Sequence, residues 1–167
     1  MGRESSLLND EIVLLLKKQF VHEMSNAFLY RTFASWCDAN GLRKSTKIFE
    51  DQYEEESSHA NAIWTYLQDC GIFVQHPEIK AINIEEIDND QKDTFRRLFE
   101  LSLEREIQTT EDLKNIAKVA INSGDYITFH FLKDLLINQV TEEKEAHDRL
   151  DAFKHSSDNL VIDRYLK

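Results

Sequence analysis

The chain has 167 residues, of which 41% are hydrophobic and 31% charged, and its formal net charge is -11 at pH 7. This composition predicts a folded globular protein, and the length suits one domain over residues 1–167. The acidic balance argues against a nucleic-acid partner, because nucleic-acid-binding proteins present a basic face, and it favours a protein that attracts cations.

Three further features set the expected location. No apolar run approaches the ~18 residues that a membrane-spanning helix needs. The N-terminal stretch MGRESS lacks the apolar region of a secretory signal. The two cysteines, Cys37 and Cys70, form no CxxC pair, so no disulfide framework is expected. We therefore expect a cytoplasmic protein with no membrane partner.

Glycine and proline are scarce, and their positions predict where helices end. Gly41, Gly71 and Gly124 divide the chain and Pro77 follows the second of them, which is typical of glycine at helix C-termini with proline beyond. None of the segments between them shows a long strand-like alternation. They predict four long helices over residues 9–40, 45–70, 90–122 and 125–153, and a short fifth helix over 158–165.

The links between these helices predict how the helices are arranged. The links at Gly41 and Gly124 are short, so each predicts an antiparallel pair. Residues 71–89 form a long link. A helix of ~26 residues is ~39 Å long, and ~19 residues of extended chain at ~3.3 Å each can run back along it. The prediction is an all-α four-helix bundle over residues 9–153, with one long crossover and parallel second and third helices.

Each predicted long helix carries polar side chains on its apolar face, which steps of three and four residues define. Burying an unpaired carboxylate costs several kcal/mol, so such groups must be ion-paired, protonated or bound to metal. Nearby cations such as Arg31, Arg105 and Lys114 are expected on other faces, which favours a divalent metal. The polar interruptions are Glu23, Glu56, His59, Glu106, Gln139 and Glu142.

The spacing of these groups repeats in the two halves of the chain. The separation between Glu23 and Glu56 equals that between Glu106 and Gln139, and each half adds a polar group three residues on. Residues i and i+3 share a helix face, so each pair can hold one ion. Oxygen ligands with one imidazole suit Fe²⁺, Mn²⁺ or Zn²⁺. Carboxylates that bridge two ions would permit a dinuclear centre, although Glu-x-x-His alone is a weak motif.

Four segments resemble the ferritins of the bacterial non-haem type, and the resemblance covers nearly the whole chain. It implies iron storage in a 24-subunit hollow shell. Fe²⁺ would be oxidised by O₂ or H₂O₂ at a di-iron ferroxidase centre in each bundle, and the ferric mineral would collect inside. The segments, in chain order, are HEMSNAFLYRTFASWCDANGL, FEDQYEEESSHANAIWTYL, LFELSLEREIQTTEDL and GDYITFHFLKDLLINQVTEEKE.

The resemblance also assigns the two iron ions of each subunit to particular ligands. One iron would be held by Glu23, Glu56 and His59. The other would be held by the bridging Glu56 and by Glu106, with Glu142 as a further candidate. Gln139 would lie close to this second iron, and Tyr30 would be the phenol beside the centre, as a redox or ligand-orienting group or as a packing residue.

Several positions depart from the family pattern. Glu55 matches a third iron site of many bacterial ferritins, but Asn138 and Thr141 replace two of its glutamates, so we expect that site to be weak or absent. Asp134 stands where a tryptophan electron donor is often found. Phe129 and Leu132 replace the two acidic residues that line the three-fold channel of animal-type ferritins, so iron uptake by that route is expected to be poor.

Other functions remain open at this point. Haem is not expected, because Ser57 follows Glu56 where a bacterioferritin usually has its haem-binding methionine, and because the second motif ends in Glu142. A ferritin shell with a slow, altered centre would act mainly in iron sequestration and protection from oxidative stress. A purely structural helical module would need no carboxylates in its core.

Overall fold

The computed structural model describes residues 7–80, 83–84 and 91–167, and within these ranges it contains helices and no β-strand. A 3₁₀ turn, η2, and a short helix, α5, follow the long helices. Each observed boundary lies within two residues of its predicted position, a difference typical of helix ends. The predicted start at residue 90 lies outside the described residues. The helices are α1 (Asp10–Ala39), α2 (Arg43–Asp69), α3 (Gln91–Asn122), α4 (Tyr126–Asp151), η2 (Ala152–Lys154) and α5 (Asn159–Tyr165).

Local sequence signals define the ends of the helices. The Asn9 side chain accepts a 2.8 Å hydrogen bond from the backbone N–H of Ile12 at the start of α1, and Asp125 caps α4 in the same way. Such caps satisfy N–H groups that have no partner within the helix. Gly41 and Gly124 have φ of 72° and 73°. This left-handed conformation favours glycine and reverses the chain after α1 and α3.

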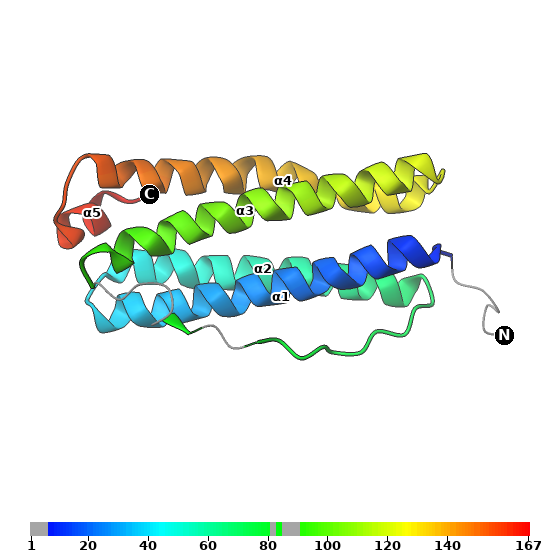
Figure 1. Cartoon of the computed structure of the whole chain (residues 1–167), viewed down its shortest axis with the longest axis horizontal. Helices are drawn as coiled ribbons and strands as arrows, with labels where there is room; N and C mark the ends of the chain where they lie inside the picture. The colour runs from blue at the N-terminus through cyan, green and yellow to red at the C-terminus, as the bar shows by residue number, and fades with distance from the viewer. Residues whose placement is uncertain (1–6, 81–82, 85–90) are drawn as a thin grey trace.

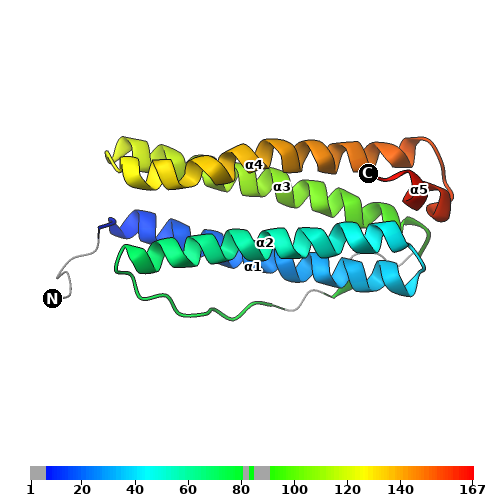
Figure 2. The same cartoon turned by 180° about the vertical axis from the view of Figure 1, so that it is seen from behind.

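The four long helices form two antiparallel pairs that lie against each other. α1 packs on α2, α3 packs on α4, and α1 also contacts α3. Figures 1 and 2 show the described parts of the crossover running along the α1–α2 pair from the end of α2 towards the start of α3. α2 and α3 therefore run parallel. The predicted four-helix bundle with one long crossover is confirmed.

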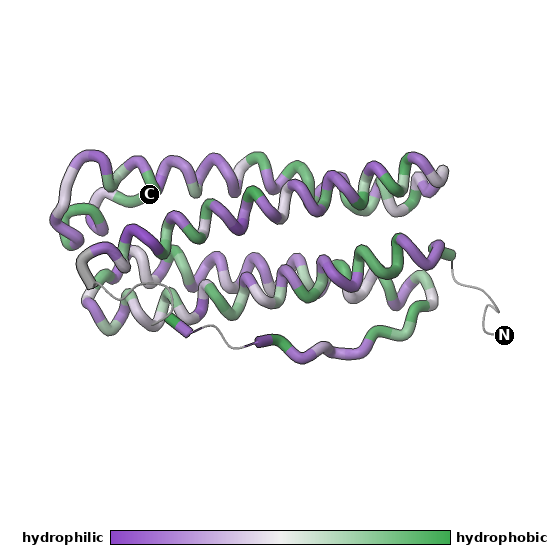
Figure 3. Tube along the Cα trace, viewed as in Figure 1, coloured by the Kyte–Doolittle hydropathy of each residue, from purple (hydrophilic) through white to green (hydrophobic). Residues whose placement is uncertain are grey.

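Two hydrophobic clusters fill the bundle, one towards each end. The first includes Leu16, Ile63 and Leu132. The second is rich in aromatic residues and includes Phe33 and Phe49, whose ring centroids are 5.3 Å apart. Fully burying side chains of this size stabilises a fold by about 1.5–3 kcal/mol each. Figure 3 shows hydrophobic and hydrophilic residues interleaved along the long helices, which is typical of amphipathic elements with one buried face.

The chain after α4 folds back onto the beginning of α2. Asp163 of α5 is buried, and its carboxylate accepts hydrogen bonds from the backbone N–H of Ser45 at 2.7 Å and from the Ser45 hydroxyl at 2.6 Å. The backbone N–H of Lys44 donates a third bond at 3.2 Å. A carboxylate at this helix end is favourable because the free N–H groups there carry partial positive charge. The predicted fifth helix is confirmed, and its anchor is Asp163.

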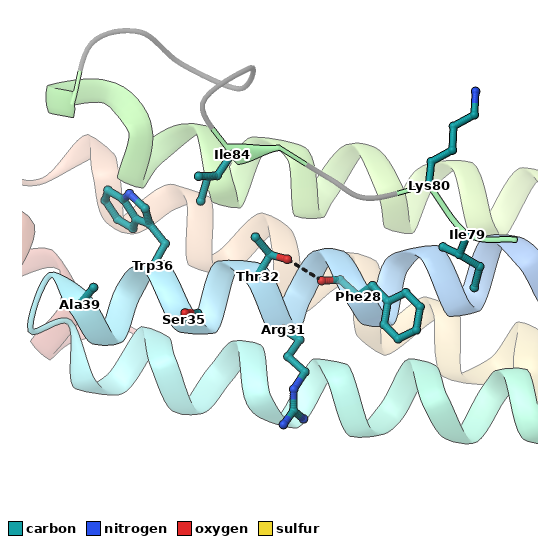
Figure 4. Close-up of a pocket in the computed structure, with 9 residues that line it drawn as sticks. All are labelled: Phe28, Arg31, Thr32, Ser35, Trp36, Ala39, Ile79, Lys80 and Ile84. Atoms are coloured by element: carbon teal, nitrogen blue, oxygen red, sulfur yellow. Dashed lines mark hydrogen bonds between the residues drawn. The ribbon is translucent and has the colours of Figure 1, made fainter.

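A groove of about 710 Å³ lies on the outside of the bundle, between α1 and the crossover. Figure 4 shows Phe28 and Trp36 of α1 facing this space, with Ile79 and Ile84 of the crossover beside it. These residues lie on a different face of α1 from the buried Tyr30, so the groove is separate from the bundle interior. In the part of the chain that is described, no helix is long and apolar enough to cross a membrane.

Candidate metal centre

Each long helix places one polar side chain in the middle of the bundle, between the two hydrophobic clusters. The four residues are between 0% and 2% exposed, as their positions on the apolar faces predicted. Because the long helices meet there, side chains far apart in the sequence come together. The residues are Glu23 on α1, Glu56 on α2, Glu106 on α3 and Gln139 on α4.

Two groups of potential metal ligands overlap at this point. The first group is Glu23, Glu56 and His59, and the second is Glu56, Glu106 and Glu142. Within each group, one ligand atom from every residue lies within 4.8 Å of the others. Glu56 belongs to both groups, so its two carboxylate oxygens could serve two ions at once. These groups bring together the same residues as the two ligand sets that the resemblance implies, and their binding of metal stays a prediction.

A third group joins Glu55 to His59 and Glu142, again with ligand atoms within 4.8 Å of one another. Glu55 is exposed, unlike the ligands of the first two groups. The side chains of Asn138 and Thr141 are exposed on α4 and contribute no carboxylate. Glu55 is therefore placed next to the two central groups and would rely on the same His59 and Glu142.

Hydrogen bonds hold one side of the centre in place. The Tyr30 hydroxyl donates to Glu106 Oε1 at 2.5 Å. The Gln139 amide nitrogen lies 3.5 Å from Glu106 Oε2 and donates a short bond to Glu142. The Thr110 hydroxyl donates to Gln139 Oε1 at 3.0 Å, which orients the amide. Tyr30 and Gln139 thus lie beside the carboxylates, where the resemblance implies that they should be.

Gln19 also contacts the centre, and the sequence did not predict this contact. Its amide nitrogen donates a 2.7 Å hydrogen bond to Glu23 Oε1, and the side chain is only 2% exposed. Gln19 lies one turn before Glu23 on α1, so spacing alone could have identified it. His22, the sequence neighbour of Glu23, contacts Thr109 of α3, with Nε2 2.8 Å from the hydroxyl oxygen.

Several oxygen atoms of the central carboxylates have no hydrogen-bond partner in the part of the chain that the structure describes. Glu23 Oε2, Glu56 Oε2 and Glu142 Oε1 are buried without a hydrogen bond. Among the described residues, their only ion-pair contacts are with His59, whose Nε2 lies 3.6 Å from Glu142. Leaving such atoms unsatisfied is costly. The carboxylates therefore require protons or metal ions.

The crowding of these carboxylates is reflected in their pKa values. Burial raises the pKa of Glu56 well above its ordinary value, and the charge of Glu23 raises it further. Burial likewise raises the pKa of Glu106 to about 7 and that of Glu142 to about 9. Burial and the neighbouring Glu106 raise the pKa of Tyr30, so its hydroxyl stays protonated as a donor. A divalent cation would stabilise the charged carboxylates that burial disfavours.

The donor set determines which metals the centre suits. Four carboxylates and one imidazole are fully or mostly buried there, and the two central groups contain no thiolate. Such ligands suit Fe²⁺, Mn²⁺ and Zn²⁺. Overlapping oxygen-rich ligand groups between the helices of a bundle are the arrangement used by dinuclear carboxylate metal proteins.

Comparison with known proteins agrees with this class. The profile of the family described as Ferritin-like domain matches residues 13–156. A bacterial non-heme ferritin of Campylobacter jejuni is 29% identical over 168 residues, covering 96% of this chain and 95% of its own length. One from Staphylococcus aureus is 30% identical over 143 residues, covering 84% and 82%. The chain belongs to the ferritin-like domain family.

Solved structures show the same fold. An open-pore ferritin from the archaeon Archaeoglobus fulgidus superposes with a TM-score of 0.84 at 24% identity, over 95% of this chain and 97% of that one. A humanised archaeal ferritin superposes with a TM-score of 0.85, also at 24% identity, over 95% of each chain. The fold predicted from the sequence is thus that of the ferritins.

Proposed function

We propose that this chain is the subunit of an iron-storage ferritin and that the centre of its bundle is a di-iron ferroxidase site. The observation that carries the proposal is the pair of ligand groups that share Glu56. Two Fe²⁺ ions held there would each give up one electron, and the two electrons would reduce O₂ to peroxide, or one H₂O₂ to water. The relatives named as non-heme ferritins support iron as the metal.

The protein residues have distinct roles in this proposal. Glu23 and His59 hold the first ion, Glu106 and Glu142 hold the second, and Glu56 bridges both. Gln139 and Tyr30 fix the orientation of Glu106 and Glu142 through hydrogen bonds. Glu55, exposed beside His59 and Glu142, would add at most a weak third ligand group. No haem is required for any of these roles.

The storage function also needs a closed shell, and we propose a 24-subunit assembly in the cytoplasm. The outer surface of α4 supports an oligomer, because it exposes apolar side chains that a subunit interface would cover. Tyr126 is 71% exposed, Ile127 66% and Val140 74%. Large apolar groups gathered on one element are typical of interaction surfaces.

The test is aerobic loading with excess Fe²⁺, followed by size-exclusion chromatography and measurement of iron per subunit. We expect a large particle that carries far more than two irons per chain. About two irons per chain in a small particle would contradict storage. Glu56→Gln removes the shared ligand and should slow initial oxidation at least tenfold, whereas Glu54→Gln, an exposed change on the same helix, should not.

A second form of the function is a shell with a slow centre, acting mainly in iron sequestration and protection from oxidative stress. The exposed Asn138 and Thr141 favour it, because the third iron site has Glu55 but lacks the carboxylates that would complete it. The rate of oxidation over successive additions of two Fe²⁺ per chain distinguishes the two. A rate that falls sharply after the first addition supports the slow form.

A further inference from the structure

The interface between α1 and α3, which we call the α1–α3 seam, carries a strip of polar residues over three helical turns next to Glu23. α1 and α3 run antiparallel (Figure 1), so residues pair in steps along the seam. Gln19 and Asp112 line one cavity together. One turn further on, His22 Nε2 lies 2.8 Å from the Thr109 hydroxyl oxygen. The two ends of the bundle are filled by apolar side chains, and this buried polar strip lies between them.

The strip contains a buried polar atom without a partner. The Asn26 side chain is 0% exposed, and its amide nitrogen lies 3.3 Å from both His22 Nε2 and the Thr109 hydroxyl oxygen. Its carbonyl oxygen has no hydrogen-bond partner among residues 7–80, 83–84 and 91–167. Leaving such an atom unsatisfied costs about 1–3 kcal/mol. A water molecule or a passing cation would satisfy it, and Asn26 is one turn beyond His22 in the direction away from the cavity.

The cavity lies at the Gln19 end of this strip, and the exposed Lys18 and Asn115 in its wall place it at the surface of the chain. It has a volume of about 110 Å³, which is room for several water molecules. Its wall includes Gln19, the residue that donates to Glu23 Oε1 at 2.7 Å. Gln19 therefore contacts both the cavity and a carboxylate of the centre. Half-buried Asp112 supplies a negative charge to the cavity wall, and exposed Lys18 supplies a positive one.

We propose that the α1–α3 seam is a route by which divalent cations pass from solvent to Glu23, with Asp112 as the first ligand and Gln19 and His22 as the onward contacts. The route rests on the function proposed above, in which the cation is Fe²⁺. One carboxylate with amide, hydroxyl and imidazole groups binds a hard cation more weakly than the cluster of glutamates does. A cation would therefore rest briefly in the seam and move inward.

The charges around the cavity make the route testable through opposite effects. Asp112 attracts a cation, so Asp112→Asn should slow loading. Lys18 repels one, so Lys18→Gln should speed it. Glu111 is next to Asp112 but is exposed and paired with Lys114, and it does not line the cavity. Glu111→Gln thus removes the same charge one position away and is the matched control.

The probe is Co²⁺, which is redox-silent here and gives visible absorption bands when carboxylates and imidazole bind it. Stopped-flow mixing of the full assembly with Co²⁺ at low ionic strength gives the loading rate, and the final absorbance gives the occupancy. We expect Asp112→Asn to be about 3- to 10-fold slower and Lys18→Gln about 2-fold faster, within the range of electrostatic steering. All variants should reach the same occupancy, and Glu111→Gln should match the wild type.

A steric variant gives an independent test. Asn115 is exposed and lines the cavity, so Asn115→Trp should cover the cavity and slow loading without changing the charge. Unchanged rates in Asp112→Asn and Asn115→Trp would overturn the route, as would equal slowing by Asp112→Asn and Glu111→Gln. If the wild type itself binds no Co²⁺ at the centre, the proposed function fails, and that result is distinct from a wrong route.

Discussion

The Tyr30 hydroxyl donates a 2.5 Å hydrogen bond to Glu106 Oε1 across the interface between α1 and α3. This bond lowers the pKa of Glu106, although burial leaves that pKa raised to about 7 overall. Because Tyr30 stays protonated, it acts on the metal centre by holding a carboxylate in its charged form and in one orientation. The relationship makes Tyr30 a positioning residue for Glu106.

Tyr30→Phe should weaken metal binding more than it weakens the fold. Without the donor, the pKa of Glu106 rises and a larger fraction of the carboxyl is protonated at pH 7. A hydrogen bond to a charged group contributes about 1.5–3 kcal/mol, so we expect Co²⁺ affinity at the second ion site to fall about 10-fold. Titration at pH 6, 7 and 8 checks this, and the deficit should shrink as pH rises. Tyr53→Phe, outside the centre, is the control, and an equal loss there would refute the role.

Binding of a divalent metal should release protons at neutral pH. The pKa of Glu142 is about 9, so this carboxyl carries a proton at pH 7 in the metal-free protein. The pKa of Glu106 is about 7, so this carboxyl is protonated in about half of the molecules at that pH. Metal ions require the charged carboxylates and displace these protons. Zn²⁺ titrations by calorimetry in buffers of different ionisation enthalpy measure the release. Binding with no proton release at pH 7 would contradict the raised pKa values.

The metal-free protein should lose stability as the pH rises from about 4.5 to about 9. The folded pKa values of Glu106 and Glu142 lie above their ordinary value of 4.5, so the folded state binds more protons than the unfolded state across this range. Their contribution is full below pH 4.5 and is lost as the pH passes about 7 and then about 9. Thermal midpoints with and without Zn²⁺ test this, because bound metal should reduce the decline.

Replacing the bridging carboxylate by an apolar side chain should stabilise the metal-free fold. Glu56 is 2% exposed and its Oε2 has no partner, so Glu56→Met removes a buried polar group at similar volume. Replacements of this kind have stabilised other proteins by about 1–4 kcal/mol. We expect a higher thermal midpoint without metal and no further rise with Zn²⁺. A lower midpoint would mean that Glu56 is a structural group.

The anchor of α5 should be separable from the metal centre. Asp163 accepts three hydrogen bonds at the start of α2. Asp163→Ala should therefore lower the free energy of unfolding by about 1–2 kcal/mol, which is within the range measured for helix caps. Hydrogen exchange should quicken at residues 43–46 and in α5. Co²⁺ occupancy should not change. Asp158→Ala is the comparison: it removes the cap of α5, whose side chain accepts from the backbone N–H groups of Leu160 and Val161, so it should quicken exchange in α5 more than at residues 43–46.

Iron uptake should not depend on Phe129. Leu132, the other apolar position noted in the sequence, is fully buried in the first hydrophobic cluster, so of the two only Phe129, 38% exposed, reaches the surface. If the seam carries the cation, Phe129→Asp leaves the loading rate of the assembly unchanged. A large gain from this single change would show that access near Phe129 was limiting.

The helices, the crossover and the buried polar residues of the bundle were predictable from the order of residues. The glycines at 41 and 124 end helices because only glycine readily adopts the positive φ found there. Glu23, Glu56, Glu106 and Gln139 were identifiable because each interrupts an apolar face at a matching depth. These signals are local or periodic, so they can be read from the order of residues.

Only the tertiary structure showed how these residues meet across helices. Gln19 contacts Glu23, Asp163 caps the start of α2, and His22 meets Thr109, and the last two pairs are distant in sequence. Helix periodicity gives the face on which a residue lies but not the partner that face meets. That partner depends on the rotation and offset of neighbouring helices, which the packing of the whole core decides.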